Sequence, residues 1–412
     1  MTTEINTLST GVGAEKISAY HWLMFSICFF GNVMGGTAST LMSVYLPVVV
    51  KDLLGVVDNE QLNQVSAYIS ALYFVGWAIG GLSWGFLADR IGRVRSLAMA
   101  MGMFGLATFL IGFSTSWEMV MILRFVCGFG VGGMMVINTT FLSETWPEKS
   151  RAVFIGILSI GFPVGIFSSG AVNFFVSSWQ QGFMMGMLPL GISVVAILVL
   201  RESEKWKASQ SLSKANRTKV NLGEHRKDLI NGSIIFGSML IGLWAVFSWV
   251  PTWVQSLMTN SDGQQERSLS MMLLGVGGLS GGFFSGWIAN ALGTRKAMIL
   301  CFSGCFILSC LLFKGNTTFT TITLVEIGML SFMFGISQGL LGVYIPLLFP
   351  VSIRASATGF CFNIGRFFTA AAVYFVGTLV ATLNGYGNSL FTFSFVFLMG
   401  LIFLLFSKKI TN

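Results

Sequence analysis

Charged residues and histidine are scarce in this chain of 412 residues. Only 10% of the residues are charged, 54% are hydrophobic, and the mean hydropathy is +0.78. A soluble domain of this length needs more polar surface, so the composition indicates a membrane protein. The two histidines, His21 and His225, lie in polar flanks, which excludes a histidine-based metal pair or catalytic triad. We therefore expect a protein that is not an enzyme, with no catalytic residue, metal or cofactor.

Other signals are also missing. No glycine-rich loop ends in Lys-Ser or Lys-Thr, which argues against an ATP-driven pump. The polar N-terminus precedes a long apolar run, so we expect no cleaved signal peptide. The cysteines fall inside apolar runs, where they act as small hydrophobes, and we expect no disulfide. They are Cys28, Cys127, Cys301, Cys305, Cys310 and Cys361.

Long apolar runs dominate what is present. A helix that spans a bilayer needs about 20 mostly apolar residues, and continuous runs of this kind form helices in lipid. The sequence predicts an all-α polytopic membrane protein with twelve spans. These are 20–46, 64–87, 95–115, 118–142, 152–174, 182–200, 229–255, 268–290, 296–314, 321–346, 355–380 and 388–407. Residues 51–63 form the main external loop in this interpretation.

The chain repeats itself. GFLADRIGRVR, which starts at Gly85, returns as GWIANALGTRK at Gly286, and the flanking motifs repeat at similar offsets. A duplication predicts two pseudo-symmetric six-helix bundles with a site between them, as in secondary transporters. We expect bundles over 1–200 and 229–412, joined by a cytoplasmic linker over 201–228. An ordinary solvated linker is favoured over a short amphipathic helix anchored by Trp206.

Basic residues gather in the loops of one side. Nineteen of the 24 lysines and arginines fall there, three fall on the opposite side, and Arg124 and Arg366 lie inside spans. The positive-inside rule then places both termini in the cytoplasm, in the inner (cytoplasmic) membrane. Because the charge is spread over short loops, we expect no nucleic-acid partner. The expected partners are membrane lipid and a small solute, with the protein a monomer.

Two glycine and charge motifs have structural interpretations. Asp89, with Arg93 one turn later, is expected to latch one conformation at the cytoplasmic face, and Asn290 replaces the acid in the second copy. The G-x-G-x-x-G pattern of Gly128, Gly130 and Gly133 lies within an apolar helix with no strand before it. We therefore interpret it as close helix packing and not as a dinucleotide site.

The run GFLADRIGR resembles the loop signature of the major facilitator superfamily. RFVCGFGVGG and SETWPEKSRA, with LLFPVSIRASATGFCFNIGR later, are most similar to its sialate and lactate group of organic-anion symporters. The resemblance implies two bundles that rock around a cavity lined chiefly by helices one, four, seven and ten. Glu144 and Arg151 within these motifs become candidates for gating, beside Asp89 and Arg93.

The two intramembrane arginines are the main functional candidates. Arg366 lies roughly 18 Å along its helix, near mid-membrane, where a charge is expensive and normally faces a cavity or partner. Its guanidinium could bind a substrate carboxylate, and Asn363 could assist; a structural role is the alternative. Arg124 could contribute positive potential or pair with Glu326 as a gate or proton carrier. Independent snorkelling of Arg124 and Glu326 is the alternative.

Further polar or aromatic residues are expected to face the cavity: Asn32, Trp244, Gln338 and Tyr344. Sugar-transporting members carry an Asp where this chain has Asn32. Coupling of transport to an ion gradient then has to use Glu326, the substrate's own carboxylate or a cation such as H⁺ or Na⁺. Otherwise the protein is a facilitator. We expect transport of a small organic anion, such as a sugar acid like sialic acid. A drug or metabolite exporter, a facilitative sugar transporter and a non-transporting receptor are the alternatives.

Overall fold

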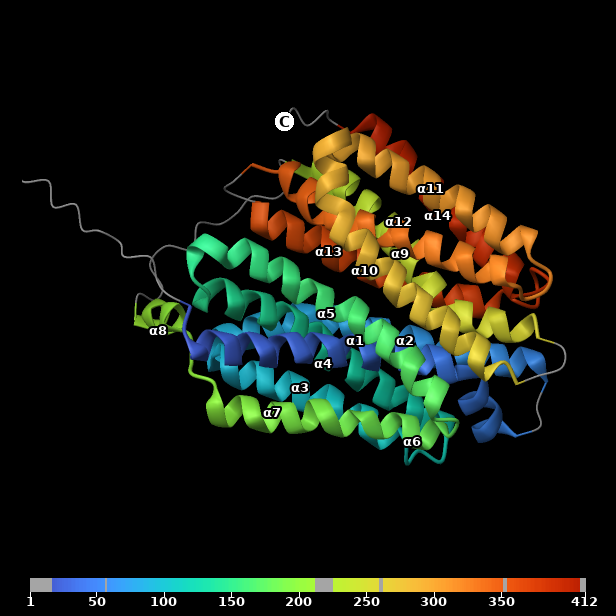
Figure 1. The fold of residues 1–412 in the computed structure, drawn as a ribbon, viewed down its shortest axis with the longest axis horizontal. Coiled ribbons are helices and arrows are strands. Elements are labelled where there is room, and N and C mark those ends of the chain that lie inside the picture. Colours follow the sequence, from blue (N-terminus) through green and yellow to red (C-terminus); the bar gives the residue numbers. More distant parts are fainter. Residues whose placement is uncertain (1–16, 56–57, 212–224, 259–261, 351–353, 408–412) are drawn as a thin grey trace, which may run out of the picture.

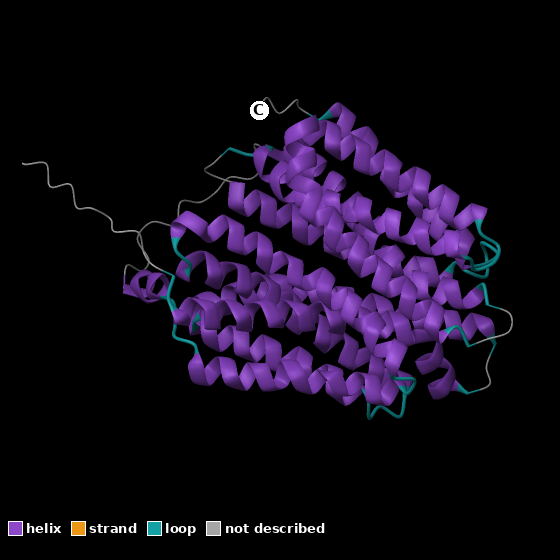
Figure 2. Ribbon diagram, viewed as in Figure 1, coloured by secondary structure: helices purple, strands orange, loops and turns teal. Residues whose placement is uncertain are grey.

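The structure is a computed structural model that describes residues 17–55, 58–211, 225–258, 262–350 and 354–407. In these ranges the regular secondary structure is entirely helical (Figure 2). The elements are α1 (Ala19–Leu54), α2 (Asn59–Ile91), α3 (Arg93–Ile111), α4 (Trp117–Thr145), α5 (Glu148–Phe175), α6 (Trp179–Phe183), η1 (Met184–Gly186), α7 (Met187–Val199), α8 (Glu204–Ser211), α9 (Arg226–Ser256), α10 (Gln264–Leu292), α11 (Thr294–Gly315), α12 (Thr321–Leu347), α13 (Arg354–Thr378) and α14 (Tyr386–Phe406).

Twelve of these helical segments are long and apolar enough to cross a membrane, with α6, η1 and α7 forming one of them. All twelve predicted spans are therefore confirmed, and the chain is a multi-pass membrane protein. The expected external loop over 51–63 is wrong in extent. Helix α1 continues through Pro47 to Leu54 and α2 begins at Asn59, so only a short turn separates them.

The helices form two bundles, one from α1–α7 and one from α9–α14 (Figure 1). The bundles meet chiefly where α5 packs on α10 and α2 packs on α13. We call the end that carries α8 and the α2–α3 turn the linker end. The opposite end, with the α1–α2 turn, is the hairpin end.

The duplication is visible in the backbone. Gly92 separates α2 from α3 with φ of 105°, and Gly293 separates α10 from α11 with φ of 80°. Side chains rarely adopt these values, so glycine is needed at both turns. The two copies of the loop motif therefore build the same helix junction in each bundle.

Glycines bring pairs of helices into backbone contact. A Cβ on Gly128 or Gly132 of α4 would overlap the carbonyl oxygens of Tyr73 or Trp77 in α2. In the second bundle, Gly281 of α10 meets α12 in the same way. The helix-packing interpretation of the G-x-G-x-x-G pattern is confirmed, since small residues allow this close approach in membranes.

The linker contains a helix, although an ordinary solvated linker was expected. Helix α8 covers Glu204–Ser211, and residues 212–224 lie outside the described residues. The indole nitrogen of Trp206 donates a hydrogen bond to the backbone carbonyl of Asp89 at 3.0 Å. The side chain thus docks on the α2–α3 turn and ties the linker to the first bundle.

We predict that Gly128→Ala lowers the free energy of unfolding by about 1–3 kcal/mol, because the added methyl group overlaps the α2 backbone. Gly156→Ala in α5 is the matched control, since open space surrounds that position, and it should be neutral or slightly stabilising. Thermal unfolding of the purified protein in detergent measures both. Equal melting temperatures for the two variants would contradict the close packing of α4 on α2.

Candidate functional site

The two bundles are joined at the hairpin end. The side chain of Asn173 in α5 donates to the Ser268 hydroxyl of α10 at 2.7 Å, and Gln264 donates to the Asn173 carbonyl at 2.6 Å. The Tyr386 hydroxyl of α14 donates to the Asn63 side chain of α2 at 2.5 Å. These cross-bundle hydrogen bonds close the space between the bundles at this end.

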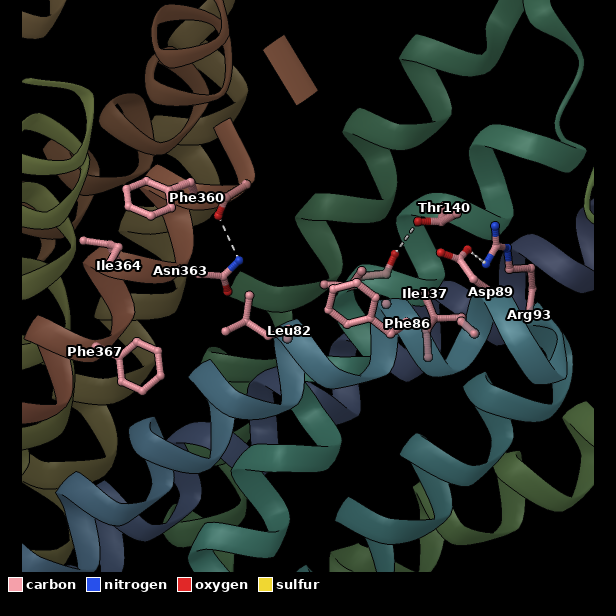
Figure 3. A pocket seen from close by; sticks show the side chains of 15 residues that line it. Leu82, Phe86, Asp89, Arg93, Ile137, Thr140, Phe360, Asn363, Ile364 and Phe367 are labelled. Carbon is pink, nitrogen blue, oxygen red and sulfur yellow. Dashed lines mark hydrogen bonds and ion pairs between the residues drawn. The ribbon is translucent and has the colours of Figure 1, made fainter. Parts of the chain in front are cut away.

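A cavity of about 580 Å³ lies between the bundles on the linker-end side (Figure 3). Helices α2 and α4 form one wall and α13 forms the other. From Gly81 to Asp89 it follows α2 for roughly 12 Å. The lining residues are mostly apolar: Gly81, Leu82, Gly85, Phe86, Ala88, Asp89, Arg93, Val136, Ile137, Thr140, Gly359, Phe360, Asn363, Ile364 and Phe367. Of the four spans expected to line the cavity, the first, fourth, seventh and tenth, only the fourth (α4) does so here. The other walls come from α2 and α13, which separate towards the linker end.

Arg366 lies at the middle of α13, next to two residues that line the cavity, and is not itself among the lining residues. Its Nη1 donates to the Asn363 side chain at 3.2 Å and lies close to Gly81, and both neighbours line the cavity. No carboxylate of the described residues lies within 4 Å of its guanidinium. A charge at this depth with one neutral partner leaves its donors available to an anion.

Aromatic rings surround the inner side of Arg366. Its guanidinium carbon is 5.8 Å from the ring centre of Trp77, which is 5.0 Å from Trp244 and 5.8 Å from Phe162. The Trp77 indole nitrogen is buried and has no hydrogen-bond partner in the described part of the chain. The arginine thus lies beside one ring of an aromatic cluster that is built by three helices, α2, α5 and α9.

Arg124 is bound within its own bundle. Its guanidinium donates to the α1 carbonyls of Ala38 and Ser39 at 2.8 and 3.2 Å and lies 4.1 Å from the Tyr73 ring centre. Glu326 instead accepts a hydrogen bond from Asn316 at 2.6 Å. The predicted pairing of Arg124 with Glu326 is not found, because Arg124 points to the α1 backbone and Glu326 to Asn316. The snorkelling alternative also fails for Arg124, which is buried.

Asn32 joins a buried amide network and does not line the cavity. It donates to the Leu158 carbonyl at 2.9 Å and accepts from Asn138 at 3.0 Å, which connects α1 with α5 and α4. Asn138 also donates to the Cys28 carbonyl. The predicted contact of Asn32 with substrate is thus replaced by helix-helix bonding in this conformation.

Of the other predicted ligand residues, two lie at or near the cavity and two do not. Trp244 belongs to the aromatic cluster and Asn363 lines the cavity beside Arg366. Tyr344 is buried, with its hydroxyl 2.6 Å from that of Ser407, so it is not at the cavity as expected. Gln338 is exposed on α12 and is not among the residues that line the cavity.

Sequence and fold comparisons agree on the family. Residues 27–373 match the Major Facilitator Superfamily. The chain belongs to this superfamily. It is 27% identical to a sialic acid transporter of Escherichia coli (strain K12), over 88% of each chain, and 26% identical to a 4-hydroxybenzoate transporter of Pseudomonas aeruginosa, over 90% of this chain and 88% of that one. A structure of the E. coli xylose transporter in a partially occluded inward-open conformation aligns with a TM-score of 0.75 at 14% identity, over 95% of this chain and all of that one.

Membership of the major facilitator superfamily makes the chain a transporter and not an enzyme. Its relatives carry small organic acids, which supports an organic-anion transporter. Within the described residues, no group of three or more His, Cys, Asp or Glu side chains could hold a metal ion.

The superfamily's loop motif forms a charged cluster at the mouth of the cavity. Arg93 contacts Asp89 at 2.6 Å and Glu144 at 2.8 Å. Glu202 accepts hydrogen bonds from the backbone N–H groups of Arg93 and Val94, which caps α3. All of these residues lie in the first bundle or the linker, so the cluster latches α2, α3, α4 and the linker together.

The remaining gating candidates are not part of this cluster. Arg151 donates to the Trp146 carbonyl and to Glu148. In the second bundle, Asn290 is exposed and Thr294 occupies the position equivalent to Arg93, so no matching ion pair forms there. The ion-pair cluster is therefore seen in the first copy among the described residues, and its role in holding one conformation stays a prediction.

Several site residues escaped sequence reasoning. Trp77 and Gly81 lie on α2 and Phe162 on α5, helices that the superfamily pattern does not place at the centre of the cavity. For Trp77, the sequence indicates only its depth in the membrane. Trp77 precedes Asp89 by twelve residues, which places it roughly 18 Å into the membrane and level with Arg366.

We predict that Glu144→Gln lowers the free energy of unfolding by about 1–3 kcal/mol, because it removes the charge that accepts from a mostly buried Arg93. Glu148→Gln is the control, since that carboxylate is 80% exposed in its pair with Arg151 and should cost less than about 1 kcal/mol. Detergent melting curves compare the two. The latch would be refuted by an equally small effect at both positions.

Proposed function

We propose that the protein is a secondary transporter that binds the carboxylate of a small organic anion at Arg366. The observation that supports this most strongly is a guanidinium at mid-membrane that has no counter-charge among the described residues and contacts two residues that line a cavity. Guanidinium donors match the geometry of a carboxylate and form two parallel hydrogen bonds with it. A bound anion supplies the charge partner that the protein lacks.

The surroundings of Arg366 favour an acid with a flat, apolar body. Besides Asn363, the polar residues that line the cavity are Thr140, Asp89 and Arg93. The Thr140 hydroxyl already donates to the Val136 carbonyl at 2.9 Å, and Asp89 and Arg93 form an ion pair at the mouth. The Trp77 ring centre lies 5.8 Å from the guanidinium carbon of Arg366, and its buried indole N–H has no partner in the described residues. Aromatic rings stack well on an indole ring, whereas a sugar acid leaves many hydroxyl groups without partners.

A sugar acid such as sialic acid is the second candidate substrate. The support for it is the 27% identity to a sialic acid transporter over most of both chains. Cationic drugs are disfavoured, because an arginine next to the cavity repels them.

Transport follows from alternating access. The cavity is open towards the linker end and cross-bundle hydrogen bonds close the hairpin end. We assign the linker end to the cytoplasm, because the basic loops lie there and the positive-inside rule applies to short loops. The conformation is then inward-facing, in the cytoplasmic membrane, with both termini inside.

We predict that Arg366→Gln weakens binding of 4-hydroxybenzoate by roughly 30-fold or more, because it removes the charged partner of a buried carboxylate. Arg366→Lys should retain part of the affinity, since it keeps the positive charge but loses the planar guanidinium that can form two parallel hydrogen bonds with a carboxylate. Calorimetric titration of the purified protein measures both, and Lys314→Gln at the hairpin end is the control. A folded Arg366→Gln variant with unchanged affinity would end the carboxylate-anchor proposal.

We predict that Trp77→Leu weakens binding of 4-hydroxybenzoate and nicotinate by about 2- to 10-fold through loss of ring stacking. Binding of N-acetylneuraminate should change less. Trp287→Leu on the exposed face of α10 is the matched control and should leave all three affinities unchanged. If N-acetylneuraminate alone binds to the unaltered protein, the sugar-acid candidate replaces the aromatic one.

A further inference from the structure

The arginines inside the spans and at the mouth of the cavity differ in whether their partners belong to the same bundle. Arg124 is bound by carbonyls of α1, and Arg93 by Asp89 and Glu144, all within the first bundle. When two bundles rock as rigid bodies, such partners stay in place. These two arginines therefore keep these partners throughout a transport cycle.

Arg366 is different because its surroundings are divided between the bundles. Asn363 belongs to its own helix, whereas Trp77 and Gly81 belong to α2 of the other bundle. Rocking has to change these cross-bundle contacts. Of the described carboxylates, Glu326 is the one that lies well inside a span, and it is bound by Asn316. The chain thus supplies Arg366 with no counter-charge in the described structure.

From this asymmetry we propose that the protein is an obligate exchanger, which returns across the membrane only when an organic anion is bound at Arg366. The inference rests on the proposed function. In the present conformation Arg366 is only partly buried, and its neighbours Asn363 and Gly81 line the cavity. In the occluded state between the two orientations, an empty site must bury an unpaired charge, whereas a loaded site buries a neutral ion pair.

The size of the effect follows from the cost of an arginine at the centre of a membrane. That cost corresponds to a rate about 100-fold slower for the empty carrier than for the loaded one. Because a monocarboxylate neutralises Arg366, the loaded carrier crosses without net charge in either direction. Exchange of two monocarboxylates should therefore be insensitive to the membrane potential.

Proteoliposomes that contain the full chain test the proposal. Uptake of radiolabelled 4-hydroxybenzoate, nicotinate and N-acetylneuraminate is measured separately, into vesicles preloaded with the same unlabelled acid and into acid-free vesicles. We expect initial uptake to be about 100-fold faster into preloaded vesicles for at least one acid. An imposed potassium diffusion potential should not alter that rate.

The possible contrary results are distinguishable. Uptake into acid-free vesicles at the preloaded rate, with or without an imposed proton or sodium gradient, overturns exchange and leaves the anion-transport proposal standing. Absence of uptake of all three acids under every condition, by protein that remains folded, overturns both proposals.

A carboxylate introduced next to Arg366 by mutation offers a second test, which needs no substrate. A Cβ on Gly81 would lie 3.4 Å from Nη1 of Arg366, so Gly81→Asp places a carboxylate next to the guanidinium. The isosteric and uncharged Gly81→Asn is the matched control. Opening of the hairpin end is followed by maleimide labelling of Ala67→Cys, because Ala67 is fully buried there beside Gly377.

In the Ala67→Cys background without ligand, we expect slow labelling that Gly81→Asp accelerates by about 100-fold and Gly81→Asn does not. The chain without the Ala67 substitution gives the background from native cysteines. Fast labelling of the empty protein with Gly81 intact overturns the proposal, because it means that an unpaired Arg366 does not hinder reorientation. If Gly81→Asp does not fold, the labelling rate with and without 4-hydroxybenzoate decides in its place.

Discussion

A lipid bilayer supplies no hydrogen-bond partners, and this constraint shapes every level of the structure. It requires the spans to be helical, and it requires buried polar side chains to find partners within the protein. Trp249 donates to the Val373 carbonyl, Tyr45 to that of Val176, and Arg124 to two carbonyls of α1. Arg366 is the charge at mid-membrane to which the described structure gives neither a carboxylate nor a backbone acceptor. The candidate site lies beside this charge.

The same constraint separates rigid contacts from changeable ones. Within each bundle, glycines let helix backbones touch, and the Arg93 cluster fastens the first bundle to the linker. Between the bundles, the hairpin end is held by a few neutral hydrogen bonds, α5 and α10 also approach closely at Gly170 and Gly275, and the linker end is separated by the cavity. Few and neutral cross-bundle bonds can be exchanged at low cost, which suits a carrier that must open at each end in turn.

Sequence patterns predicted the helices and the duplication well because hydrophobic length and repeated motifs are local signals. Arg366 and Asn363 were also identifiable, since a charge deep in an apolar run is rare. Partners across helices were harder to predict: Arg124 and Glu326 lie at similar depths, yet depth does not tell which direction a side chain faces. Tyr344 and Asn32 were assigned to the cavity for the same reason, although packing directs them to Ser407 and Asn138. Trp77 was not predicted as a site residue, because it comes close to Arg366 only where α2 and α13 meet in the folded protein.

The most direct test of the account is an experimental structure of the full chain with 4-hydroxybenzoate bound. The account predicts that the carboxylate lies within hydrogen-bond distance of two guanidinium nitrogens of Arg366, with the ring against Trp77. A carboxylate bound at Arg124 or outside the cavity, with Arg366 still bonded only to Asn363, would contradict the central claim.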